Sequence, residues 1–378
     1  MLTPKDMQNQ ADKISDIYSA LEDSIFKRII QVLSNSRYSE VTQNNVLLWQ
    51  AEQLKKMGML NHQVIELLAN ETKKSQKEIE QLIQKNGYTI VNQIDRQLEK
   101  IMHKEVPVTK EIENMLDSLV NQTFLDLNNN VNQTLITTNY GENRVSRVFQ
   151  EIIKKSTLEV ISGLKTHEKA IRDNVYKWVD NGINSSFIDR AGHEWSMETY
   201  TRMVINTTSH RTYNDLRLKR MKDFDCVTAR MSSHACARKA CAYIQGQVVN
   251  VVPMSDDRAN AYYDSIYNHG YGEPNGTQGI NCKHILYPFV PDVNTNNELK
   301  IDPEEAIKNG EIQQKQRKFE QDIRHQKKRL LVAQELDDET MQSKCQAVIL
   351  AKQKALRELI SSHEFLNRDY NREQIQSS

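Results

Sequence analysis

Three of the five cysteines and three of the ten histidines lie between residues 232 and 288. The possible metal ligands among them form an early and a late group: His234, Cys236 and Cys241, then Cys282 and His284. A structural zinc site needs four nitrogen or sulfur donors, usually as close pairs that a loop brings together. The sequence therefore predicts zinc as a cofactor, held by His234, Cys241, Cys282 and His284, with Cys236 as the alternative ligand.

A second interpretation of the same residues remains open. Their spacing is not the Cys-X2-Cys pair of common zinc modules. The histidines can instead be hydrogen-bonded and the cysteines buried as free thiols, because free cysteine packs as a small hydrophobe. In a reducing cytoplasm clustered cysteines more often bind metal or stay free than form disulfides.

The same window allows one catalytic interpretation. His269, Asn281 and His284 invite comparison with a His-Asn-His nuclease, in which a histidine activates water beside a metal ion. That chemistry requires a fold that brings all three together, and their spacing alone does not. A metal-dependent nuclease or toxin-like enzyme built on the Cys/His module is therefore the alternative function.

Two basic stretches are candidates for non-specific contact with DNA. They comprise Arg217, Lys219 and Arg220 at a predicted helix end, and Lys327, Lys328 and Arg329 in the tail. Such side chains can neutralise phosphates without reading base sequence. The competing interpretation is a solvated helix face with interleaved acids.

The overall composition predicts a helical and elongated protein. The 378 residues carry 50 Lys and Arg against 50 Asp and Glu, so no overall basic charge favours nucleic acid. The mean hydropathy of −0.68 leaves little apolar sequence for one large core. The polar start predicts no signal peptide, and no apolar run approaches the roughly 18 residues of a membrane span. We expect synthesis in a reducing cytoplasm and no membrane partner.

Four regions are expected: a helical N-terminal region (1–135), a helical middle region (136–224), a small α+β Cys/His-rich module (225–292) and a charged helical tail (293–378). The fold class is mainly α. In the module, residues 247–252 are the best strand candidate, and residues 259–269 are expected to form a short helix. Residues 197–221 are predicted as one helix. The tail is expected to be a helical hairpin with its corner at residues 336–339.

Apolar spacing and turn residues give finer predictions for the helices. One stripe contains Leu60, Val64, Ile65, Leu67 and Leu68; the next contains Ile79, Leu82 and Ile83; a third contains Val145, Val148, Phe149, Ile152 and Ile153. Breaks are expected at residues 70–72, near Gly87, at 128–133, at 139–141 and at 190–193.

Several motifs together resemble the phage minor capsid protein 2 family, which is related to the MuF-type head-morphogenesis proteins of tailed phages. They are Ser232-Ser233-His234, Arg238, Gln245-Gly246, Gly279-Ile280-Asn281-Cys282-Lys283-His284 and Pro288-Phe289. The resemblance covers roughly residues 190–372. Cys241 stands where the family usually has His, and these two residues replace each other readily as zinc ligands. Cys236 stands where Gly is usual.

The resemblance implies a non-enzymatic minor structural protein of a tailed-phage head. Its partners would be the portal protein and other head proteins, and it would lie in the virion at low copy number. It would act in head assembly and in DNA ejection. No phosphate-cradling glycine loop is present, and we expect no small-molecule substrate.

Overall fold

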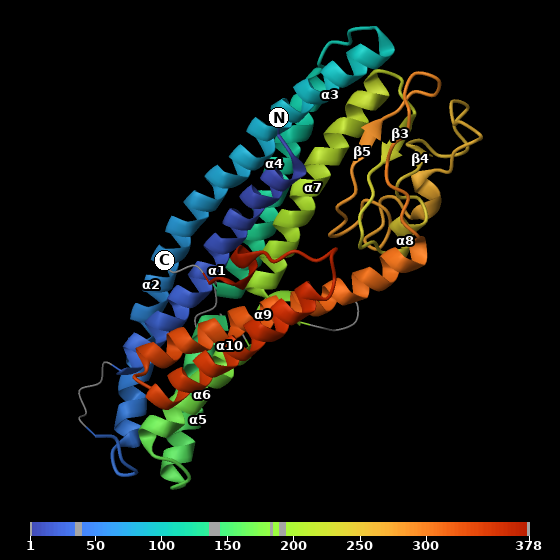
Figure 1. Cartoon of the computed structure of the whole chain (residues 1–378). Coiled ribbons are helices and arrows are strands. Elements are labelled where there is room, and N and C mark those ends of the chain that lie inside the picture. Colours follow the sequence, from blue (N-terminus) through green and yellow to red (C-terminus); the bar gives the residue numbers. More distant parts are fainter. Residues whose placement is uncertain (1, 35–39, 136–143, 182–183, 189–193, 376–378) are drawn as a thin grey trace.

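The computed structural model of the chain describes residues 2–34, 40–135, 144–181, 184–188 and 194–375. Long helices run side by side along an elongated body, with a small β-containing module beside one end (Figure 1). The helices of this rod are α1 (Pro4–Ser34), α2 (Val46–Glu80), α3 (Asn86–Met102), α4 (Lys110–Leu135), α5 (Arg144–Ile161), α6 (His167–Asn181) and α7 (Met197–Asp223). Before α7, β1 (Asn184–Ile188) pairs antiparallel with β2 (Glu194–Ser196).

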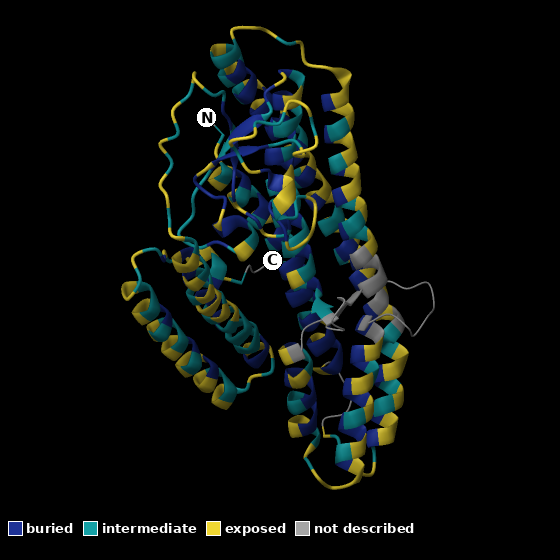
Figure 2. Ribbon diagram, turned by 90° about the vertical axis from the view of Figure 1, so that its right-hand side faces the viewer, coloured by how far each residue is buried: buried dark blue, intermediate teal, exposed yellow. Residues whose placement is uncertain are grey.

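The core of the rod is a stripe along each helix. On α1 the buried side chains include Ala11, Ile14, Tyr18, Leu21 and Ile25, which recur at intervals of three or four residues. That spacing places them on one helix face. They join one apolar cluster with side chains from α2 to α7 and from the tail. Figure 2 shows these buried residues between the helices and the exposed ones on the outer faces. The predicted mainly helical, elongated fold is confirmed.

Three predicted helix breaks are wrong. Helix α2 continues through residues 70–72, and α4 continues through residues 128–133. Near Gly87 a π-helical turn (Gln81–Lys85) leads directly into α3. A side chain at Gly87 would place its Cβ 2.3 Å from Leu116 Cδ2 of α4, so this glycine permits close helix packing and ends no helix. The breaks predicted at 139–141 and 190–193 lie outside the described residues.

The apolar stripes were predicted well, with one exception. The side chains of the second and third stripes are buried in the core, as are Leu60, Val64 and Leu68. Ile65 is 45% exposed, on the outer face of α2 together with Leu47 and Leu54. Helical spacing places Leu47, Leu54 and Ile65 in one line. Among the described helices, none is both long and apolar enough to cross a membrane.

The module is organised around a three-stranded antiparallel sheet. Its central strand β3 (Thr228–Met231) pairs with β4 (Val248–Asn250) on one side and with β5 (Leu286–Pro288) on the other. The predicted strand is confirmed in its central residues. The helix predicted over 259–269 is wrong: only a 3-10 turn, Ile266–His269, forms there. The Asn250 side chain instead donates to the carbonyls of Asn260 and Tyr263, which holds this segment as a loop.

The module has its own apolar cluster, which also includes side chains from the rod. Cys241, Val249, Cys282 and Leu286 pack there with residues of α3 and α7. Ala306 of the tail joins the same cluster. The division into four regions remains a prediction.

The tail forms the expected helical hairpin. Helix α9 (Pro303–Glu335) begins with Asp302, whose side chain accepts from the Glu305 amide, and α10 (Glu339–Ser361) follows after a tight corner. Residues 336–338 make that corner, as predicted. Ile323, Ile349 and Leu356 form a small cluster within the hairpin. A 3-10 turn, Tyr370–Glu373, lies against α9.

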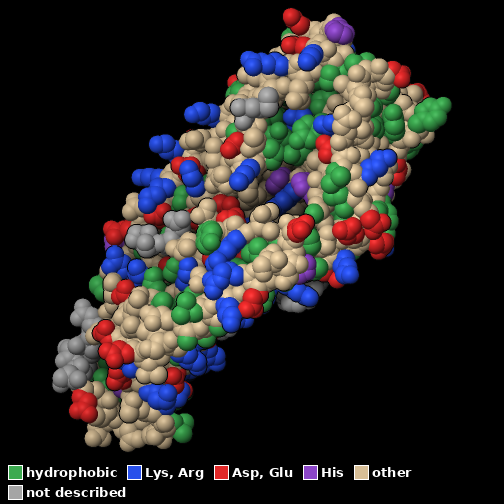
Figure 3. All heavy atoms as spheres, viewed as in Figure 1, with side chains coloured by type: hydrophobic (Ala, Val, Ile, Leu, Met, Phe, Trp, Pro, Cys, Tyr) green, Lys and Arg blue, Asp and Glu red, His purple; other side chains and the backbone are tan. Residues whose placement is uncertain are grey.

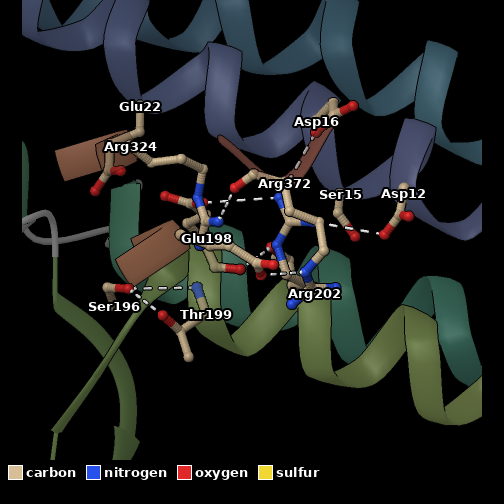
Figure 4. A network of polar contacts seen from close by, with 12 residues as sticks. Asp12, Ser15, Asp16, Glu22, Ser196, Glu198, Thr199, Arg202, Arg324 and Arg372 are labelled. Carbon is tan, nitrogen blue, oxygen red and sulfur yellow. Dashed lines mark hydrogen bonds and ion pairs between the residues drawn. The ribbon is translucent and has the colours of Figure 1, made fainter. Parts of the chain in front are cut away.

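A buried polar network joins the hairpin to the rod. Glu198 at the start of α7 lies 3.3 Å from Arg324 and 2.8 Å from Lys328 of α9. Lys328 also lies 2.7 Å from Glu22 of α1. Figure 4 shows Arg202 between Glu198 and the α1 carboxylates of Asp12 and Asp16. Burial opposes ionisation of Glu198, but these cations outweigh it and lower the Glu198 pKa to about 2.

Candidate metal centre

Three of the four predicted metal ligands meet in the buried interior of the module. Cys241 lies on α8 (Lys239–Ala242), and Cys282 and His284 lie just before β5. The two Sγ atoms are 3.8 Å apart, and Cys282 Sγ is 3.6 Å from His284 Nδ1. In a tetrahedral zinc site, bonds of about 2.0–2.3 Å place the donors roughly 3.5–3.8 Å apart. The observed spacing therefore fits a metal ion, and this group could hold one.

Gln245 orients the His284 ring. Its side-chain Oε1 lies 3.0 Å from His284 Nε2. An amide oxygen only accepts, so Nε2 carries a proton, and Nδ1 is the ring nitrogen that faces Cys282. Metal-ligating histidines are usually held in this way by a second hydrogen bond.

The two cysteine thiols have unequal environments. The hydrogen bond to Cys282 and burial raise the pKa of the Cys241 thiol. Accepting that hydrogen bond, with help from His284, lowers the pKa of Cys282 well below its usual value although burial opposes this. Cys282 therefore has thiolate character, the form that binds metal.

His234 lies beside this group without joining it. Its ring packs edge-on against His284, with 4.7 Å between ring centroids. Its Nε2 is 3.1 Å from the Lys283 carbonyl and 3.3 Å from Ser232 Oγ. Burial, together with nearby His284, lowers the pKa of His234 to about 4, so the ring is neutral. His234 still lines the pocket of about 290 Å³ that reaches the three clustered ligands.

Cys236, the alternative ligand, points elsewhere. Its thiol lies 3.5 Å from the Asn309 carbonyl of α9. Cys236 lines the same pocket but is absent from the group of three. Within the described parts of the chain, no fourth side chain completes the group.

The other motif residues shape the loops around the ligands. Ser232 exchanges two hydrogen bonds with Ile285, each of 2.9 Å. Arg238 donates to the carbonyls of Pro274 and Ile280. A Cβ on Gly279 would lie 2.4 Å from each of the carbonyl oxygens of Glu273 and Pro274, so the loop closes only with glycine there.

The residues of the nuclease interpretation are not gathered at one metal group. His269 Nε2 lies 2.7 Å from Asp264 Oδ2. His269 is absent from the group that contains His284, whereas Asn281 lines the pocket beside that group. Asn281 has a left-handed backbone (φ 59°), which suits a turn.

The basic face predicted at the end of α7 is not a surface. Arg217 and Arg220 are 2% and 0% exposed. Arg217 donates to the Leu286 carbonyl of β5 and lies over the Tyr213 and Tyr287 rings. Arg220 lies 2.6 Å from Asp95 of α3. These arginines therefore connect α7 to β5 and α3, a role that the sequence did not indicate.

The remaining basic candidates have local partners. Lys219 pairs with Glu111 at 2.6 Å, and Arg329 with Asp180 at 3.3 Å. Lys327 donates to Gln374, and Lys328 belongs to the buried network described above. DNA contact by these four residues stays a prediction.

Comparison of the sequence with known proteins supports the family resemblance that the motifs indicated. Residues 2–361 match the model of the family described as phage minor capsid protein 2. The chain belongs to this family. This minor capsid family member is 42% identical over 362 residues to a protein named "Structural protein" in Lactococcus phage LL-H. The match spans 95% of this chain and 98% of that relative. It is also 45% identical over 120 residues to a "Structural protein" of Lactococcus phage mv4. That match spans 32% of this chain and 98% of the relative. No solved structure matches it.

The minor capsid assignment covers the rod as well as the module. The family match begins at residue 2, whereas the motifs indicated the family only from about residue 190. The N-terminal helices carry apolar spacing but no chemical motif, so the sequence patterns did not show that they belong to the same family.

Proposed function

We propose that this protein is a low-copy component of a tailed-phage head, where it associates with the portal protein and acts in head assembly. The family match over residues 2–361 carries this proposal. The name of the LL-H relative, a phage structural protein, supports a place in the virion. The role is binding without turnover, and the protein stays with or leaves with the packaged DNA.

The outer face of α2 supports a role in protein contact. Leu47, Leu54 and Ile65 expose 61%, 38% and 45% of their surfaces along one line. Exposed apolar stripes of this kind favour partner contact. We propose that this stripe, called the α2 stripe below, contacts another head protein.

Zinc is the proposed cofactor of the module. Cys241, Cys282 and His284 would hold it, with water or His234 as the fourth donor. Zinc would supply no catalysis here and would tie α8 to the segment that leads into β5. The 3.8 Å and 3.6 Å donor separations support this assignment.

Quantitative mass spectrometry of purified phage particles tests the head proposal. We expect a reproducible copy number far below that of the major capsid protein. Absence from particles would overturn the virion proposal. Co-purification with co-expressed portal protein then tests portal association, and labelling of infected cells tests whether the protein enters the host with DNA.

The α2 stripe is tested by changing Leu54 and Ile65 together to Glu. Both side chains are exposed, so we expect the thermal unfolding temperature to change little and incorporation into particles to fall at least about tenfold. Leu350 on α10, which is 66% exposed, provides the control as Leu350→Glu. Normal incorporation of the double variant would show that this stripe contacts no essential partner.

A further inference from the structure

A hollow opens where the module, α7 and α9 meet. It has a volume of about 610 Å³ and adjoins the pocket of about 290 Å³ beside the metal ligands, with shared lining at Arg238 and Lys283. Figure 3 shows basic and histidine side chains gathered in a hollow between the rod and the module. A volume in this range is typical of sites that take a small ligand or a short peptide segment.

Positive charge exceeds negative charge in the lining of this hollow. Lys283 lies near two cations, Arg317 and Arg372, and near the carboxylates of Asp12 and Asp369. None of the described carboxylates forms an ion pair with its ammonium, and Asp12 is already paired with Arg202. Arg238 donates only to backbone carbonyls, which do not neutralise its charge. Arg317 and Arg372 share one carboxylate, Glu320, at 2.9 Å and 2.7 Å.

Several of these cations therefore lack a carboxylate of their own. Glu311 is the acidic residue among the described side chains that line the hollow. A fourth lining arginine, Arg202, is balanced by Asp12, Asp16 and Glu198. The excess rests on Lys283, Arg238 and the Arg317–Arg372 pair, and an anion entering the hollow would meet all of them.

The shape and lining favour an acidic peptide over DNA. The cations lie inside a hollow, whereas binding of a duplex requires cations spread along an accessible surface. Apolar groups, including Met203 and Ile307, lie in the same lining. A peptide that alternates acidic and apolar side chains matches both kinds of contact.

We propose that this hollow binds an acidic segment of another protein through Lys283, Arg238 and the Arg317–Arg372 pair. Carboxylates of the segment would pair with these cations, and its apolar side chains would contact Met203 and Ile307. The inference rests on the proposed head function only in taking a head protein as the source of the segment.

Fluorescence anisotropy with the purified full chain tests the site. The probe is a fluorescein-labelled peptide of alternating glutamate and leucine, compared with a twin that has glutamine for glutamate. We expect the glutamate peptide to bind, and Lys283→Gln and Arg317→Gln each to weaken binding by about fivefold to tenfold. Lys354→Gln on α10, a residue paired with Glu358 and outside the lining, is the control and should bind as the unchanged protein does.

Three outcomes would overturn the site. They are no binding of the glutamate peptide, equal binding of its glutamine twin, and equal weakening by the Lys354 control. Binding of an oligothymidine strand that depends on Lys283 and Arg317, without binding of the peptide, would assign the hollow to nucleic acid instead. Lys283 adjoins two metal ligands, so Arg317→Gln decides the result if Lys283→Gln lowers the thermal unfolding temperature. The probe is a synthetic peptide, so a failure to bind it would overturn the proposed peptide site only. The mass spectrometry of phage particles would still test the head proposal separately.

Discussion

At the residue scale, the candidate metal group depends on a few side chains held by their neighbours. Cys241 and Cys282 come from segments 41 residues apart, yet their sulfur atoms lie 3.8 Å apart. Gln245 orients His284, and the unequal thiol pKa values leave Cys282 ready to act as a thiolate ligand. The module has few long apolar side chains, so a metal ion would add stability that its small core lacks.

We therefore predict that Cys241→Ser and Cys282→Ser each lose bound zinc and lower the thermal unfolding temperature by at least about 5 °C. Elemental analysis by plasma mass spectrometry and thermal unfolding measure these effects. Cys345→Ser serves as the control, because Cys345 is a buried free cysteine of α10 outside the metal group. If the unchanged protein contains no zinc and chelators do not alter its unfolding temperature, zinc binding is wrong. The cluster would then consist of hydrogen-bonded histidine and buried free thiols.

Arg220 is a second residue whose environment determines its role. It pairs with Asp95 and Asp223 and donates to the carbonyls of Val106 and Pro107. Removing one partner of a buried ion pair leaves the other charge unsatisfied.

We predict that Arg220→Met lowers the free energy of unfolding by about 3–5 kcal/mol. Lys222→Met on the same helix, at an exposed position, should change it by less than about 0.5 kcal/mol. Urea unfolding of the two variants compares them. Similar small losses in both would mean that the buried guanidinium contributes little to stability.

At the element scale, the contact between α9 and the rod combines few apolar side chains with many charges. Lys328 reaches Glu22 and Glu198, whereas Asp23 lies farther away at 3.8 Å. Asp23 Oδ2 has no hydrogen-bond partner among the described residues. Burial raises the pKa of Asp23 to about 7, although Lys328 lowers it in part.

This raised pKa gives a pH dependence of known sign. An unfolded Asp has a pKa of about 3.9. Between that value and about 7, folded Asp23 keeps a proton that the unfolded chain has released. Its contribution to stability is therefore full at low pH and is lost as the pH rises toward 7. Other groups titrate in the same range, so the effect of Asp23 must be measured as a difference between variants.

We predict that Asp23→Asn stabilises the protein at pH 8 by about 1–4 kcal/mol relative to its effect at pH 4. Lys328 keeps Glu22 and Glu198 as partners in this variant. Thermal and urea unfolding across this pH range provide the test. The comparison variant is Asp12→Asn, because Asp12 also lies on α1 but is paired with Arg202. An equal difference at both pH values would show that Asp23 is ionised in the folded protein throughout.

At the scale of the whole molecule, the tail is part of the fold. Val332 and Ala333 of α9 belong to the same core as α1 to α7, and Ala306 belongs to the module core. The Ala237 amide also donates to the Ala306 carbonyl. Helix α9 thus contacts the module near its start and the rod farther along its length.

We predict that a chain ending at Ile301 is less stable than the full chain. It would expose the Ala306 site in the module and leave Glu22 and Glu198 without Lys328. Differential scanning calorimetry should show a lower unfolding temperature, whereas a chain ending at Ser362, which keeps the hairpin, should be less affected. Equal unfolding temperatures for the Ile301 chain and the full chain would show that the tail folds independently.

The sequence alone determined the helical class and much of the candidate metal group. Apolar residues at helical spacing share one helix face, so the stripe at residues 145–153 was predictable. Cys241, Cys282 and His284 were predictable because few residue types bind zinc. The strand at β4 followed from its β-branched residues.

Only the tertiary structure decided features that depend on neighbours distant in the sequence. Gly87 was predicted near a helix end but permits close packing against Leu116, and Ile65 faces outward although its neighbours are buried. Arg217 and Arg220 were predicted on a surface, but packing of α7 against α3 and β5 buries them. The hollow at Lys283 is built from residues of α1, α7 and α9 and from loops of the module, which are far apart in the sequence. Local spacing fixes which residues share a helix face, whereas tertiary packing decides which faces are covered and which charges are paired.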